Sequence, residues 1–137
     1  MKTILVIDGQ GGSIGKLIVE RIKALHYDDA EVIGLGTNSI ATQSMLKAGA
    51  DEGATGENPV IYNAGFADII IGPIGIAFAN SLNGEITPEM AKAVTSSRAS
   101  KIYVPINKCN HVIVGLTNDK SLSSLLDEVI DELKKLL

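Results

Sequence analysis

The stretch TILVIDGQGGSIG at residues 3–15 decides the fold. Residues 3–8 form a short, uninterrupted apolar run rich in branched side chains, which predicts a buried β-strand. Four glycines follow within seven residues, and from Ser13 onward apolar side chains recur at the spacing of a helix. This stretch therefore predicts a strand, a glycine-rich turn and a helix in direct succession.

The same alternation of strand and helix continues along the chain. Further strands are predicted at 31–35, 51–55, 68–72, 101–105 and 112–116, and helices at 13–25, 39–48, 75–82, 87–98 and from 122 to the end. The pattern at 57–65 is ambiguous and predicts one or two helical turns. Such alternation predicts an α/β fold, a Rossmann-like three-layer sandwich with a mostly parallel sheet of five to six strands. The link at 106–111 is too short for a helical crossover, so we expect the last strand to be antiparallel. Residues 1–137 are expected to form a single nucleotide-binding domain.

The composition excludes several classes of protein. The chain has 137 residues, of which 45% are hydrophobic and 20% charged, so disorder is not expected. A net charge of −4 argues against a nucleic-acid partner, and the single cysteine excludes an internal disulfide framework. The N-terminus lacks a signal-peptide pattern, and no apolar stretch is long enough for a membrane helix. We therefore expect a cytoplasmic protein.

The glycine-rich turn is the strongest functional signal. Gly9, Gly12 and Gly15 form a G-x-x-G-x-x-G pattern between a strand and a helix, where backbone N–H groups and the helix N-terminus can bind a phosphate. The candidate cofactor-binding residues of this loop are Asp8, Gly9, Gln10, Gly11, Gly12, Ser13, Ile14 and Gly15.

This hypothesis has an alternative, a tight turn with no ligand. If a phosphate lies against the loop, Gly12→Val should sharply lower the affinity for a nucleotide or anion and leave the fold intact. A Walker A loop is excluded because Leu17 follows Lys16 where a hydroxyl is required. For Asp8, a structural role within the loop is favoured over a role as a base.

Two further loops are expected at the same edge of the sheet. Thr37, Asn38 and Ser39 follow the second strand, where they could bind a ribose or simply form a turn with Ser39 as the helix cap. The sequence has neither the acid nor the arginine usual at this strand end, which predicts weak discrimination between NAD and NADP. Gly72, Pro73 and Gly75 could lie against the ligand or form a rigid turn.

Cys109 and His111 resemble a nucleophile and a base on one hairpin. The pair lacks a third group to orient the histidine, and a lone Cys-x-His is too few ligands for zinc. We expect neither catalysis nor a metal site from them.

The chain resembles a small bacterial domain-of-unknown-function family, numbered 3842. The resemblance rests on IDGQGG at 7–12, LGTNS at 35–39, GATGEN at 53–58, IGPIGI at 71–76 and GEITP at 84–88. It implies a Rossmann-like fold and no established activity, and it draws attention to residues 55–58.

A purely structural subunit with an empty loop is one interpretation, and two functions remain open beside it. One is an oxidoreductase that binds a nucleotide or dinucleotide, NAD or NADP, with its substrate site supplied by another subunit. The other is a binding module that senses a nucleotide or another phosphorylated small molecule without turnover. A domain of this size leaves half of a dinucleotide uncovered, so a homodimer or higher homo-oligomer is expected.

Overall fold

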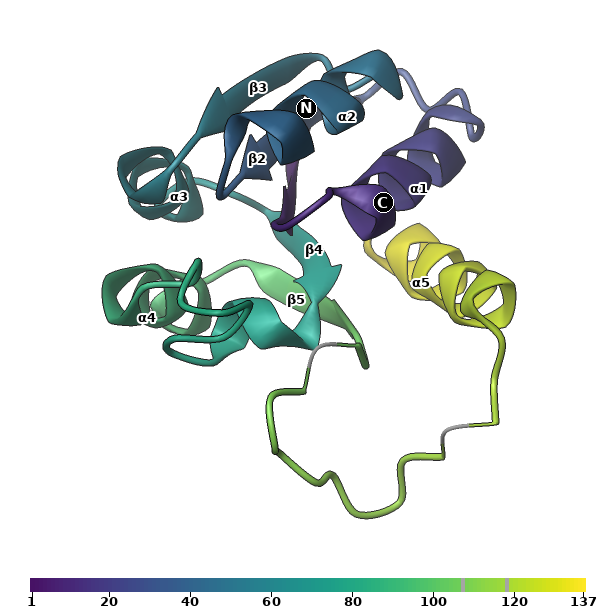
Figure 1. Ribbon diagram of the computed structural model, residues 1–137. Coiled ribbons are helices and arrows are strands. Elements are labelled where there is room, and N and C mark those ends of the chain that lie inside the picture. Colours follow the sequence, from purple (N-terminus) through teal and green to yellow (C-terminus); the bar gives the residue numbers. More distant parts are fainter. Residues whose placement is uncertain (107, 118) are drawn as a thin grey trace.

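Five parallel strands form one sheet in the order β3-β2-β1-β4-β5 within the part of the chain that the computed structural model describes, residues 1–106, 108–117 and 119–137 (Figure 1). The strands are β1 (Lys2–Asp8), β2 (Ala30–Gly36), β3 (Glu52–Thr55), β4 (Ile69–Pro73) and β5 (Ser100–Val104). The helices are α1 (Ser13–Lys23), α2 (Ser39–Lys47), α3 (Glu57–Ala64), α4 (Pro88–Ser96) and α5 (Leu122–Leu136), with a 3₁₀ helix, η1, at Ile74–Ala77. The predicted Rossmann-like α/β fold is confirmed.

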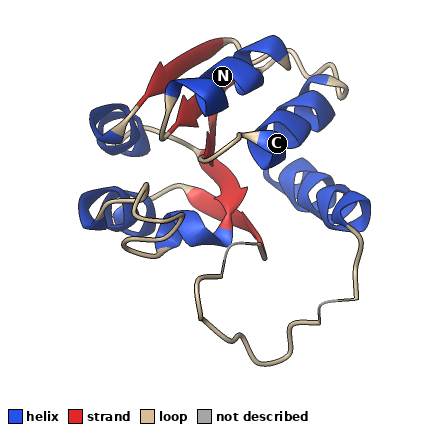
Figure 2. Ribbon diagram, in the orientation of Figure 1, coloured by secondary structure: helices blue, strands red, loops and turns tan. Residues whose placement is uncertain are grey.

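The central strand explains why both faces of the sheet are covered. β1 pairs with β2 along its whole length and with β4 over Ile4–Val6. Because side chains alternate along a strand, Ile4 and Val6 pack under α1, α2 and α5, whereas Leu5 and Ile7 pack under α3 and α4. All four side chains are fully buried. Figures 1 and 2 show the resulting three layers, with the helices on either side of the strands.

Local sequence signals set the starts of two helices. Thr87 caps α4 by accepting a hydrogen bond from the backbone N–H of Met90 at 3.1 Å. The expected cap of α2 was wrong by one residue. Asn38, not Ser39, is the cap, and its side-chain oxygen accepts from the N–H of Ala41 at 3.0 Å.

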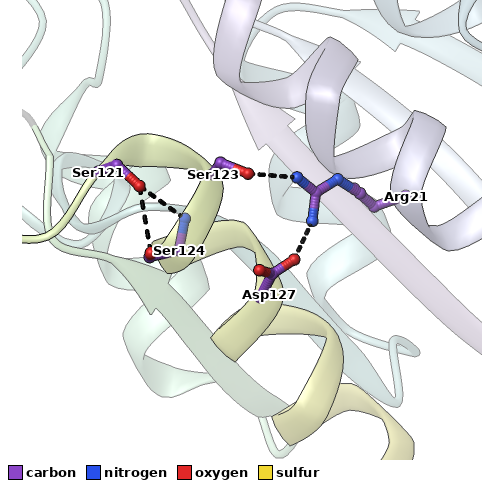
Figure 3. Close-up of polar contacts among 5 residues, drawn as sticks. All are labelled: Arg21, Ser121, Ser123, Ser124 and Asp127. Atoms are coloured by element: carbon purple, nitrogen blue, oxygen red, sulfur yellow. Dashed lines mark hydrogen bonds and ion pairs between the residues drawn. The ribbon is translucent and has the colours of Figure 1, made fainter.

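The last helix is held against the first by polar contacts as well as by apolar packing. Arg21 on α1 donates to the carboxylate of Asp127 at 2.5 Å and to the hydroxyl of Ser123 at 3.1 Å (Figure 3). Ser121 caps α5 by accepting from the backbone N–H of Ser124 at 3.1 Å. These contacts place the start of α5 beside α1, on the face of the sheet opposite α3 and α4.

Two elements differ from the prediction. Residues 112–116 form no strand: they follow turns at Cys109 and Asn110, which both have positive φ, and Val112 and Val114 are 90% and 96% exposed. An apolar run without a neighbouring strand to bond cannot form a ladder, so the expected antiparallel sixth strand is absent from this described segment. The helix expected at 75–82 is reduced to η1, because Asn80 and Leu82 adopt left-handed backbone conformations that end regular helix.

Candidate functional site

The loops after β1, β2 and η1 meet at the carboxyl edge of the sheet. Helices α1 and α2 lie on one face and α3 and α4 on the other, so the direction of the crossovers reverses between β1 and β4. In open α/β sheets, ligands bind outside the carboxyl ends of the strands at such a reversal. The glycine-rich turn, residues 9–15 including the first three residues of α1, lies at this point.

Buried Asp8 fixes the backbone of the glycine-rich turn by accepting hydrogen bonds from it. It is 3% exposed, and its two carboxylate oxygens accept from the backbone N–H of Gly9 at 2.8 Å and of Gly15 at 2.6 Å. Burial raises the pKa of Asp8, the backbone N–H groups of Gly15, Gly9 and Ile14 oppose that rise, and the charge of Glu85 adds to it. Asp8 therefore bonds to N–H groups at the start of α1 that a phosphate would otherwise use.

Packing explains three of the four glycines in the turn. A Cβ on Gly12, whose φ is +75°, would lie 2.6 Å from the Cα of Ala41, and one on Gly15 would lie 2.8 Å from the Cβ of Asp8. A Cβ on Gly9 would lie 2.6 Å from the hydroxyl of Thr37. These contacts argue against the expectation that Gly12→Val leaves the fold intact.

Gly11 alone in the turn faces open space. A Cβ there would meet no atom within 4 Å, and the residue is exposed. Within the described residues, the backbone N–H groups of Gly11 and Ser13 make no hydrogen bond to protein, whereas that of Gly12 donates to the carbonyl of Gly9 at 2.9 Å. These two free N–H groups are the part of the turn that a ligand can still reach.

The sequence-based reasoning missed Glu85. One carboxylate oxygen, Oε1, accepts from the backbone N–H of Gln10 at 2.8 Å, from the Asn38 side-chain amide at 3.2 Å and, through a short hydrogen bond, from the Thr37 hydroxyl. We call Glu85, Gln10, Thr37 and Asn38 the Glu85 cluster. The other oxygen, Oε2, has no hydrogen-bond partner in the described part of the chain.

The hydrogen bonds of the Glu85 cluster favour the ionised form of Glu85. Partial burial raises the pKa of Glu85, but the three donors from Gln10, Thr37 and Asn38 outweigh it and hold the pKa below its ordinary value of 4.5. Asn38 also donates to the carbonyl of Gln10 at 2.9 Å, which ties the end of β2 to the glycine-rich turn. Glu85 lies in the GEITP motif, but no spacing rule connects it with residues so distant in sequence.

The remaining candidate residues lie outside both the glycine-rich turn and the Glu85 cluster. Gly72 and Pro73 are the buried end of β4, not a loop, and the carbonyl of buried Gly75 accepts a short hydrogen bond from the hydroxyl of Ser81. Ser39 is the exposed first residue of α2. The structure thus brings residues 8–15, Thr37 and Asn38 together, whereas Gly72, Pro73 and Gly75 are buried.

The described contacts of His111 are with groups other than the Cys109 thiol. The ring of His111 stacks on Phe78 with centroids 3.8 Å apart, and its Nδ1 lies 2.8 Å from the carbonyl of Lys108. Cys109 is exposed and has a φ of 47°. Within the described residues, no group of three or more His, Cys, Asp or Glu side chains could hold a metal ion.

Two other features lie at the carboxyl ends of the two edge strands, β3 and β5, on either side of the glycine-rich turn. Thr55, in the segment that the family resemblance singled out, has its hydroxyl 2.7 Å from that of Thr42 and so joins the edge strand to α2. An apolar hollow of about 300 Å³ lies between β5 and α5, lined by Ile102, Val104 and Val129 among others. No helix within the described ranges is long and apolar enough to cross a membrane.

A parallel sheet with helices on both faces and a glycine-rich turn at the crossover reversal defines a Rossmann-like α/β protein. The chain belongs to the family described as Domain of unknown function (DUF3842), whose model matches residues 3–137. No curated protein matches the chain.

Several solved structures are similar to this chain at low sequence identity. A probable oxidoreductase from Mycobacterium abscessus has a TM-score of 0.51 and 23% identity, over 98% of this chain and 42% of that one. A dodecameric FMN-dependent Ubix-like decarboxylase from Escherichia coli O157:H7 has a TM-score of 0.49 and 14% identity, over 98% and 95% of the two chains. A short chain dehydrogenase/reductase from Saccharomyces cerevisiae has a TM-score of 0.46 and 18% identity, over 98% and 62%. This chain spans less than two thirds of the first and third, and the likeness concerns the fold alone.

Proposed function

We propose that this protein binds a nucleotide or dinucleotide, NAD or NADP in the first instance, across the carboxyl ends of β1 and β2. The observation that supports this most directly is the Glu85 cluster, which sets one unbonded carboxylate oxygen beside the open part of the glycine-rich turn. A nucleotide needs two such features, donors for its phosphates and an acceptor for its sugar hydroxyls.

In this proposal the phosphate group lies against the N–H groups of Gly11 and Ser13. Both N–H groups are free of protein partners in the described residues, and Ser13 begins α1, where the helix dipole favours an anion. Asp8 sits beneath the turn with both oxygens bonded, so it holds the turn in shape and is not available as a base. The phosphate site is therefore smaller than the glycine pattern suggests.

Ligand titration tests the proposal. Isothermal titration calorimetry with NAD⁺, NADP⁺, FMN and ATP should give saturable binding for at least one of them. Gly11→Asp places a negative charge where the phosphate is proposed to lie, and Gly11→Asn is its matched neutral control, since neither side chain meets a neighbour near its Cβ. We expect affinity to fall about tenfold or more in Gly11→Asp relative to Gly11→Asn, as for one unfavourable charge contact. No binding of any of the four compounds to the wild-type protein would refute the proposal.

Turnover and assembly form a second part of the proposal. An oxidoreductase would need a substrate site from a second subunit, because a domain of this size supplies only the cofactor half of such an enzyme, whereas a sensor would need only the nucleotide. We propose a homodimer, because a sheet of this size covers only part of a dinucleotide. Sedimentation velocity at micromolar concentration, with and without the bound nucleotide, measures this directly, and a strict monomer in both states would leave the sensor as the better function.

A further inference from the structure

We propose that Glu85 determines specificity at this site: its Oε2 accepts hydrogen bonds from the hydroxyls of a nucleotide ribose, so that a free 2′-hydroxyl is selected over a 2′-phosphate. This inference rests on the proposed function and names its ligand class, a nucleotide with an unmodified ribose. It reverses the expectation from Thr37, Asn38 and Ser39 alone, whose neutral side chains predicted weak discrimination.

The geometry supplies the acid that the end of β2 lacks. Glu85 is 47 residues from Asn38 along the chain, yet its Oε1 accepts from both Asn38 and Thr37, the residues that directly follow β2. A carboxylate at this strand end is where the fold binds ribose hydroxyls. Here the side chain arrives from the loop before α4, so its position is tertiary and not local.

The two oxygens of Glu85 have different surroundings. Oε1 has three donors, which orient the carboxylate and consume its acceptor capacity on that side. Oε2 has no protein donor in the described residues, and Glu85 is only partly buried. An ionised oxygen held in place and unbonded is suited to accept from the paired hydroxyls of a ribose, and it repels a phosphate on the same carbon.

A clamp between loops is the competing role for Glu85, and Glu85→Gln separates the two. Glutamine keeps an acceptor at Oε1 for Gln10, Thr37 and Asn38, and it replaces Oε2 with an NH₂ donor. A clamp alone survives this change, whereas a ribose acceptor does not. Glu89, exposed in the first turn of α4 and also acidic, provides the matched control Glu89→Gln.

The test is calorimetry with NAD⁺ and NADP⁺, which differ only in the 2′-phosphate. We expect wild-type protein to bind NAD⁺ at least tenfold more tightly than NADP⁺, and the ratio of the two dissociation constants to fall about tenfold in Glu85→Gln, because a charged acceptor is lost and a phosphate repulsion is removed. Glu89→Gln should retain the wild-type ratio. Thermal melting of each variant confirms that it is folded.

A ligand-side experiment does not depend on any variant. NAD⁺ lacking its 2′-hydroxyl should bind wild-type protein several-fold more weakly than NAD⁺, since a site built to bond a hydroxyl rejects the analogue without it. Binding of NAD⁺ and NADP⁺ with equal affinity, or an unchanged ratio in Glu85→Gln, overturns this inference and leaves the proposed function standing. No binding of any nucleotide overturns both.

Discussion

Replacing Gly12 with alanine tests whether the glycines of the turn serve packing or ligand binding. Gly12 has a φ of +75°, and its new Cβ would lie 2.6 Å from the Cα and 3.1 Å from the Cβ of Ala41 on α2. A left-handed conformation costs an L-residue about 1–2 kcal/mol, and overpacking against backbone costs about 1–3 kcal/mol more. We therefore expect Gly12→Ala to lower the free energy of unfolding by about 2–5 kcal/mol, a large share of the roughly 5–15 kcal/mol typical of a domain.

Gly11→Ala is the matched control for this experiment. A Cβ at Gly11 meets nothing within 4 Å, and its φ lies outside the left-handed region, so the substitution should be neutral or stabilise by up to about 1 kcal/mol. Urea unfolding of both variants, followed by far-ultraviolet circular dichroism, measures the difference. If Gly12→Ala unfolds within about 0.5 kcal/mol of the wild-type protein, the packing argument is refuted and the ligand becomes the better explanation for Gly12.

Three further predictions follow from the described contacts. The pKa of Glu85 is held below its ordinary value of 4.5, so ionised Glu85 stabilises the protein above that pH, and this contribution is lost as the pH falls through the lowered pKa. In urea unfolding across the acid range, the free energy of unfolding should therefore fall less steeply with decreasing pH in Glu85→Gln than in the wild-type protein. Val114→Asp should change the free energy of unfolding by less than about 0.5 kcal/mol, because Val114 is 96% exposed; a loss above about 1.5 kcal/mol would mean that residues 112–116 pack as the strand that the sequence predicted. Cys109→Ala should leave nucleotide affinity within about threefold of the wild-type value, since Cys109 is exposed and His111 is engaged with Phe78; a tenfold loss by calorimetry would make this segment part of the site.

The order of strands and helices could be predicted from the sequence because it depends on neighbouring residues. Each of these signals is contained in a short stretch of sequence: the apolar run at 3–8, the helical periodicity after Ser13 and the Thr87-Pro88 start of α4. Short apolar runs are ambiguous, however, and whether 112–116 forms a strand depends on a partner with free N–H and C=O groups. At that point the local pattern predicted a strand and the structure has none.

By itself, the sequence determined that a glycine-rich turn joins a buried strand to a helix at the carboxyl edge of a parallel sheet. Only the tertiary structure decided what the turn does, because its neighbours come from distant segments. Ala41 explains Gly12, and Glu85 reaches Gln10 across 75 residues. Hydrogen bonds and steric contacts act over a few ångströms of space and are independent of separation along the chain, so the acid that appeared to be missing after β2 became visible only once the loops were brought together.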